Sequence, residues 1–181
     1  IRDELTKLGY TFNTQSDTEV LLKAYIAWDT GCLKKLNGQF AFIIYDSLNN
    51  RIFFARDGIG IKPLYYTLLD DDTLVISSEP KGILVYPDFK KKPDLEVIAD
   101  YFLGTMTFTD GCEFLDRSFF EGLYALNPGN YGIFDQNGLQ IHEYYDVPVV
   151  ENKNMEFDST PDVREKLEKA INSKTKAFLF C

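Results

Sequence analysis

The sequence has few of the residues that build metal sites and disulfide frameworks. Its 181 residues include one histidine and three cysteines, and Cys32, Cys112 and Cys181 stand far apart. This spacing fits neither a set of paired disulfides nor the C-x-x-C pattern of a zinc site. One histidine excludes a histidine metal cluster, and a Ser-His-Asp triad would have to use His142. These counts favour a reducing compartment, which we expect to be the cytoplasm.

Positive charge and long apolar runs are also scarce. The 28 acidic residues outnumber the 19 basic ones, which gives a formal charge of −9. A surface of this sign repels the phosphate backbone of nucleic acids. No stretch approaches the roughly 20 apolar residues of a membrane span, and the first four residues lack the apolar core of a signal peptide. We therefore expect neither a nucleic acid nor a membrane as a partner.

The sequence does contain enough apolar material for a packed core. Hydrophobic residues make up 45% of the chain and include 15 Phe and 11 Tyr, a composition that excludes a disordered chain. The length predicts one domain, or one domain and a short piece of a second.

The order of expected helices and strands predicts the α+β class. Helices are expected at 2–8, 16–28, 30–36, 80–86 and 95–103, and strands at 10–12, 40–45, 51–56, 63–68, 73–78, 130–134 and 139–144. The second helix opens with Ser16-Asp17-Thr18-Glu19, which matches a capping box. We expect the strands within 40–78 to form a four-stranded antiparallel meander and those within 130–144 to form a hairpin.

After Tyr145 the pattern changes. Residues 148–159 are polar and contain Pro148, which predicts a linker. Thr160-Pro161 then opens an expected helix with proline in the favoured first position, and the apolar run 177–181 predicts a strand. We interpret 160–181 as the start of a second domain, and both ends of the chain as cut.

Several motifs that could carry chemistry are better explained by structural roles. We interpret His142 as a structural or surface histidine, Asp70-Asp71-Asp72 as a solvated hairpin turn and Gly58-Ile59-Gly60 as a turn. Arg56 and Asp57, at a strand end, are expected to fix a loop. The sequence leaves open whether Glu79 and Lys81 face a partner domain or cap the helix that follows them.

Several runs carry a resemblance to a known family. They are S-D-T-E-V-L-L (16–22), L-N-G-Q-F-A-F (36–42), A-R-D-G-I-G-I-K-P-L-Y-Y (55–66), S-E-P-K (78–81), F-F-E-G-L (119–123) and L-N-P-G-N-Y (126–131). In order and spacing they resemble the glutamine-hydrolysing domain of asparagine synthetases, over residues 1 to about 147. The run 55–66 is specific to that branch, whereas S-D-T-E is shared by class II amidotransferases. Gly58 departs from the family, which usually has a larger and often basic residue there.

The resemblance implies an N-terminal-nucleophile hydrolase fold, a sandwich of two antiparallel sheets flanked by helices, here incomplete. Residues 1–147 would be the C-terminal part of the glutaminase domain, and 160–181 the first helix and strand of an α/β synthetase domain. In the family an N-terminal cysteine attacks the amide of glutamine, an Asn-Gly segment forms the oxyanion hole and an arginine binds the substrate carboxylate. None of these has a counterpart here. We therefore expect no catalytic residue in this chain and no activity from the chain alone.

One substrate-binding residue of the family does have a counterpart, Asp17. The resemblance implies that its carboxylate accepts hydrogen bonds from the α-ammonium group of glutamine. A carboxylate in the first turn of a helix is stabilised in its ionised form by the helix dipole. The alternative is an aspartate that only caps the helix.

The resemblance also implies what the parent protein does with the ammonia. A C-terminal domain would use ATP and magnesium to activate aspartate, so glutamine, aspartate and ATP are the expected small-molecule partners, and a homodimer is compatible with the family. We expect no cofactor or metal bound to this chain itself. Two alternatives stay open: another class II amidotransferase, making an amino sugar or a peptidoglycan or capsule precursor, and a non-catalytic binding module of the same fold. The run 55–66 speaks against the first.

Overall fold

The computed structural model describes residues 1–103 and 116–146, which fall within one unit, Ile1–Asp146. Cys112 and Cys181 lie outside the described residues, and so do the linker predicted at 148–159 and the helix and strand predicted within 160–181. In the part that is described, no helix combines the length and the hydropathy needed to cross a membrane.

The helices lie close to their predicted positions. They are α1 (Arg2–Lys7), α2 (Asp17–Trp28), the 3₁₀-helix η1 (Asp29–Lys35), α3 (Pro80–Leu84) and α4 (Leu95–Leu103). The helix predicted at 30–36 therefore takes the tighter 3₁₀ form, which is common directly after an α-helix.

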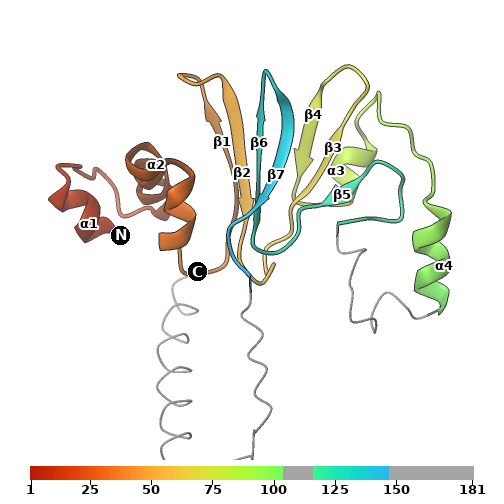
Figure 1. The fold of residues 1–181 in the computed structure, drawn as a ribbon, viewed down its shortest axis with the longest axis horizontal. Coiled ribbons are helices and arrows are strands. Elements are labelled where there is room, and N and C mark those ends of the chain that lie inside the picture. Colours follow the sequence, from red (N-terminus) through yellow and green to blue (C-terminus); the bar gives the residue numbers. More distant parts are fainter. Residues whose placement is uncertain (104–115, 147–181) are drawn as a thin grey trace, which may run out of the picture. The chain divides into compact units, whose positions relative to one another are not determined.

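The strands form two antiparallel sheets, as the resemblance predicts (Figure 1). The first sheet has the order β1 (Ala41–Asp46), β2 (Arg51–Arg56), β6 (Asn130–Asp135) and β7 (Gly138–Glu143). The second has the order β4 (Leu74–Ser77), β3 (Tyr65–Leu68) and β5 (Tyr124–Ala125). The hairpin predicted within 130–144 is confirmed by the pairing of β6 with β7.

The predicted four-stranded meander is wrong. Strand β2 pairs with β6 and not with β3, because the chain leaves the first sheet after Arg56 and enters the second sheet at Tyr65. The intervening loop is held by side chains that bind its backbone, as described below. Local strand patterns contain no signal for this change of sheet, since they specify a strand but not its partner.

The strand predicted at 10–12 is also wrong. Residues 10–12 have no regular secondary structure. The amide of Tyr10 donates to the carbonyl of Leu5 at the end of α1 (3.0 Å). The rings of Tyr10 and Phe12 pack against the core between the helices and the first sheet. Alternating apolar side chains are thus half-buried here without strand pairing.

The first sheet is covered on both faces, and strand periodicity assigns its side chains to the two sides. Phe53 and Ala55 of β2 face a cluster that includes residues of α1, α2 and η1. Ile52 and Phe54 face a second cluster shared with the second sheet. A third cluster, around Ile83 of α3, packs against the opposite face of the second sheet. The layers therefore run helices, sheet, sheet, helix.

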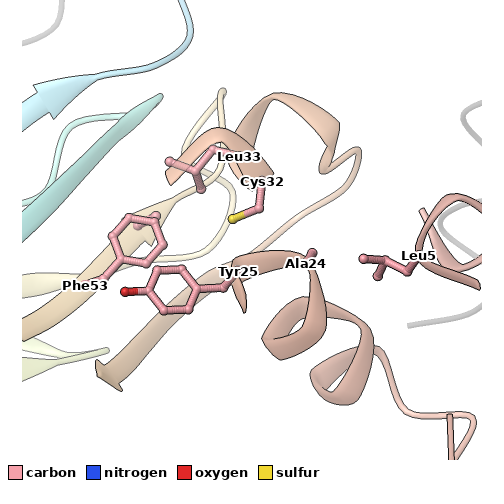
Figure 2. Packing of buried hydrophobic residues seen from close by; sticks show 7 residues of the cluster. Leu5, Ala24, Tyr25, Cys32, Leu33 and Phe53 are labelled. Atoms are coloured by element: carbon pink, nitrogen blue, oxygen red, sulfur yellow. The ribbon is translucent and has the colours of Figure 1, made fainter. Parts of the chain in front are cut away.

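Close packing in the first of these clusters buries a cysteine and makes its thiol unreactive. Figure 2 shows the Tyr25 ring beside Phe53, with a centroid separation of 5.2 Å and an interplanar angle of 16°. Cys32 is fully buried in the same cluster, and burial raises the pKa of its thiol to about 11. A thiol with so high a pKa is a poor nucleophile at neutral pH.

Gly132 in β6 leaves room for the ring of Phe54, its partner on the neighbouring strand β2. A Cβ atom there would lie 2.2 Å from Cζ of Phe54. The Phe54 ring therefore occupies the space that a side chain at 132 would need, and it also contacts Tyr66 of the second sheet, with ring centroids 5.9 Å apart.

Candidate functional site

Asp17, the predicted substrate-binding residue, is the first residue of α2. Ser16 is the N-cap, and its hydroxyl oxygen accepts a hydrogen bond from the amide of Thr18 (3.2 Å). Oδ1 of Asp17 accepts from the same amide (2.8 Å), and the Asp17 side chain is exposed. A carboxylate in this position can cap the helix with one oxygen and still offer the other to a cation. The substrate role itself stays a prediction.

The capping box predicted around Asp17 is only half formed. The Glu19 carboxylate does not reach the amide of Ser16, which donates to the hydroxyl oxygen of Thr14 (3.2 Å). Glu19 reaches further upstream, where it accepts from the amides of Asn13 (3.0 Å) and Thr14 (2.8 Å) and from the Thr14 hydroxyl (2.7 Å). The segment 11–16 curls over the first turn of α2 and brings these donors within reach.

Two basic residues complete the support of this segment. Lys23 donates to Oε1 of Glu19 (2.6 Å) and to the carbonyl of Thr11. The guanidinium of Arg2 donates to the carbonyl of Thr14 (3.0 Å) and to that of Ser16 (3.4 Å).

The Phe12 ring lies within reach of both cations. The Arg2 guanidinium is 4.3 Å and the Lys23 ammonium 4.6 Å from the ring centroid, distances at which cation–π attraction acts. Sequence reasoning did not identify either basic residue. The i,i+4 spacing of Glu19 and Lys23 was a readable signal for one of them.

The charges around Glu19 also fix its protonation. The hydrogen bond from Lys23, together with those from Asn13 and Thr14, holds the pKa of Glu19 well below its ordinary range. Glu19 is therefore ionised throughout the neutral range, and its two oxygens act only as acceptors.

The prediction that Arg56 fixes a loop is confirmed. Its guanidinium donates to three backbone carbonyls, those of Gly60 (2.8 Å), Lys62 (2.8 Å) and Leu126 (2.7 Å). The third of these bonds connects the loop to the segment that follows β5. Arg56 thus holds together two parts of the chain that are distant in sequence.

Asp57 fixes the same loop by accepting hydrogen bonds from the backbone amides of the loop. The side chain is fully buried. Its carboxylate accepts from the backbone amides of Ile59 (3.3 Å), Ile61 (3.0 Å) and Lys62 (2.9 Å). Three amide donors satisfy a buried carboxylate without any catalytic role.

The glycines of this loop are explained by close neighbours. Gly60 has a φ of +69°, and a Cβ there would lie 2.8 Å from Pro128, so the predicted turn is confirmed. A Cβ at Gly58 would lie 2.6 Å from Cδ1 of Tyr145. The Tyr145 ring takes the space that a larger residue at position 58 would need.

Two further structural interpretations are confirmed. The acidic turn joins β3 to β4, where Asp71 accepts from the amide of Thr73 (3.1 Å) and Asp70 pairs with Lys90 (2.9 Å). His142 lies on β7 and stacks on Tyr131, with ring centroids 5.0 Å apart.

Glu79 and Lys81 form an ion pair at the start of α3. Glu79 occupies the N-cap position, but its side chain accepts no amide of the first turn. The helix-capping alternative for Glu79 is therefore wrong as far as its carboxylate is concerned.

A polar hollow lies beside α4. Its volume is about 420 Å³, and its lining includes Asp94, Arg117 and Tyr124. Nη2 of Arg117 lies 2.8 and 2.7 Å from the two oxygens of Asp94 and 3.1 Å from Glu96. Burial acts to raise the pKa of Asp94, but the hydrogen bonds from Arg117 and from the amide of Val97 keep it below its ordinary value. These contacts anchor the first turn of α4.

The sequence of this chain is similar to those of known proteins. Residues 1–145 match the family model described as a glutamine amidotransferase domain. The chain is 34% identical to "Asparagine synthetase [glutamine-hydrolyzing] 3" of Bacillus subtilis, over 94% of this chain and 27% of that protein. It is 30% identical to "Amidase chry2" of Gibberella zeae, over 93% of this chain and 24% of that protein. The chain therefore spans about a quarter of the length of these two relatives.

Among solved structures, the chain is similar in fold to a glutamine phosphoribosylpyrophosphate amidotransferase from B. subtilis. The TM-score is 0.54 at 19% identity, and the match covers 81% of this chain and 26% of the other. The sandwich of two antiparallel sheets is thus shared with a solved amidotransferase.

Proposed function

Since the chain belongs to the glutamine amidotransferase domain family, which matches residues 1–145, we propose that it is part of a glutamine-dependent asparagine synthetase. In such an enzyme the side-chain amide of glutamine is hydrolysed to glutamate and ammonia, and the ammonia amidates aspartate. The observation that carries the proposal is the similarity to a glutamine-hydrolysing asparagine synthetase along 94% of the chain. The run 55–66 supports the same branch of the family.

Asp17 is the substrate contact that we propose within this chain. Its exposed carboxylate lies at the positive end of the dipole of α2 and would accept hydrogen bonds from the α-ammonium of glutamine. This contact distinguishes glutamine from amides that lack an α-amino group. Through Asp17, the proposed contribution of this chain is to bind and orient the substrate.

ATP and magnesium would serve the activation of aspartate elsewhere in the parent protein. Across residues 1–103 and 116–146, no group of three or more His, Cys, Asp or Glu side chains could hold a metal ion. We assign no step of the reaction in this region to the metal or the nucleotide.

The test is the fate of the amide nitrogen. We expect the full-length gene product, given amide-¹⁵N-glutamine, aspartate, ATP and magnesium, to transfer the label to asparagine. If aspartate is omitted, the products should be ¹⁵N-labelled ammonia and unlabelled glutamate. Absence of glutamine hydrolysis under both conditions would overturn the proposal.

A second candidate is an amidotransferase with another acceptor. The observation behind it is that the relatives of this chain include, over 93% of the chain, a protein named as an amidase and not as an asparagine synthetase. The same labelling experiment separates the two candidates, because hydrolysis of glutamine without labelled asparagine at any aspartate concentration supports the second.

A further inference from the structure

The segment 11–16, which leads into Asp17, has no helix or strand. Within residues 1–103 and 116–146, the one protein hydrogen bond to the Asp17 carboxylate comes from the adjacent amide of Thr18. A bond to the next residue cannot by itself fix the direction in which the first turn of the helix presents a side chain.

Glu19 fixes this irregular segment through hydrogen bonds to its side-chain carboxylate. One carboxylate oxygen accepts the amide of Asn13, and the other accepts both the amide and the hydroxyl of Thr14. The Glu19 side chain is 16% exposed, so water competes for these bonds only in part. Three donors from two adjacent residues converge on one ionised group.

The Thr14 hydroxyl transmits this order to the residue before Asp17. Because its proton points to Glu19 (2.7 Å), its lone pairs are left to accept the amide of Ser16 (3.2 Å). A chain of hydrogen bonds thus runs from the Glu19 carboxylate, through Thr14, to the backbone of Ser16.

We propose that Glu19 is a positioning residue for substrate binding: it fixes segment 11–16, and through it the direction of the Asp17 carboxylate toward the α-ammonium of glutamine. The inference rests on the proposed function, since it needs Asp17 to bind substrate. Lys23 and Arg2 reinforce the same segment, Lys23 at Thr11 and Arg2 at Thr14 and Ser16.

Glu19→Gln in the full-length gene product tests this role. Gln has the same side-chain length as Glu, but its NH₂ group replaces one of the two acceptor oxygens. That NH₂ group cannot accept the hydrogen bonds that the oxygen of Glu19 accepts, because it is itself a donor. We expect KM for glutamine to rise at least about tenfold, with kcat within about twofold of the wild type. Amide hydrogen exchange within 13–16 should become at least about tenfold faster. Glu4→Gln is the matched control, because Glu4 forms an exposed pair with Lys35 (2.6 Å) away from the segment, and it should change neither quantity.

The double variant shows whether Glu19 acts through Asp17. In an Asp17→Ala background, Glu19→Gln should raise KM by less than about twofold, because the group that it positions is already gone. Thr14→Val, which removes only the hydroxyl, should raise KM several-fold and gives the same test if Glu19→Gln fails to fold.

The outcomes separate this inference from the proposed function. If Asp17→Ala raises KM but Glu19→Gln and Thr14→Val do not, the positioning role is overturned and the proposed function stands. If the Glu19 and Asp17 effects on KM multiply fully, Glu19 acts by another route and the inference fails. If Asp17→Ala leaves KM unchanged, the Asp17 role in the proposed function and this inference both fall.

Discussion

Two loops of this molecule are fixed by the same kinds of hydrogen bond but differ in whether they lead to an exposed acidic side chain. In both 11–16 and 57–62, a carboxylate accepts several backbone amides of an irregular segment and an arginine binds backbone carbonyls. Asp57 is fully buried and its loop presents no acid, whereas the first segment ends at the exposed carboxylate of Asp17. The same arrangement, a charged side chain bound to backbone groups, therefore builds a scaffold in one loop and a support for a binding residue in the other.

The largest expected effect is on the scaffold loop. Asp57→Ala leaves three backbone amides without their acceptor and should lower the free energy of unfolding by about 3 kcal/mol or more. Urea denaturation of the chain measures it. Asp57→Asn, which keeps one acceptor oxygen, should cost less.

Asp71→Ala is the control for this loss, because Asp71 accepts an amide in an exposed turn and should change stability by less than about 1 kcal/mol. Equal losses for the Asp57 and Asp71 variants would contradict the scaffold role.

The second effect is on binding. Asp17→Ala should raise KM for glutamine about ten- to a hundredfold, since a hydrogen bond to a charged group is worth about 1.5–3 kcal/mol, with little change in stability. Glutamate release by the full-length gene product measures KM. The control is Asp3→Ala, because Asp3 is also an exposed acid in a first helical turn. A normal KM for Asp17→Ala would reduce Asp17 to a helix cap and remove the contrast between the two loops.

A smaller effect is expected at Gly58, within the scaffold loop. Gly58→Ala places a Cβ 2.6 Å from the Tyr145 ring and should cost about 1 kcal/mol, because the ring must shift. Gly31→Ala serves for comparison, since a Cβ at Gly31 meets no atom within 4 Å. Adding Tyr145→Ala should remove most of the penalty. If the penalty persists in the double variant, the ring contact is not its cause.

The smallest expected effect is a pH dependence of the stability that Glu19 contributes by fixing segment 11–16. Because the folded-state pKa of Glu19 is lowered from 4.5, its contribution to stability is present above the unfolded value and is lost as pH falls through the folded one. The stability difference between wild type and Glu19→Gln should thus stay constant from about pH 7 to pH 5.5 and shrink below about pH 4.5. Urea denaturation at each pH measures it. A difference that shrinks already between pH 7 and 5.5 would argue against an ionised Glu19 as the source.

Sequence reasoning predicted the parts of the fold that depend on neighbouring residues. Ser16 marks the start of α2, and the turn at 135–138 marks the last hairpin, because caps and turns are local. The pairing of β2 with β6 could not be predicted, since it joins residues that are distant in sequence, such as Phe54 and Gly132.

The candidate site shows the same division. Asp17 was identified from its motif, and its place at the start of a helix follows from the residues beside it. The partners of Glu19 were not predicted, because Asn13 and Thr14 come within its reach only after segment 11–16 has curled over the helix. Arg2 was not identified for the same reason.

The absence of a side chain at Gly132 has a consequence for any attempt to redesign the interior. With the Phe54 ring of the neighbouring strand seated where a methyl group would go, even an alanine at this point would have to displace that ring. The ring has little room to move, since the ring of Tyr66 on the second sheet packs against it, with centroids 5.9 Å apart. Enlarging one of the two residues will therefore require trimming the other, and the pair should be varied as a unit.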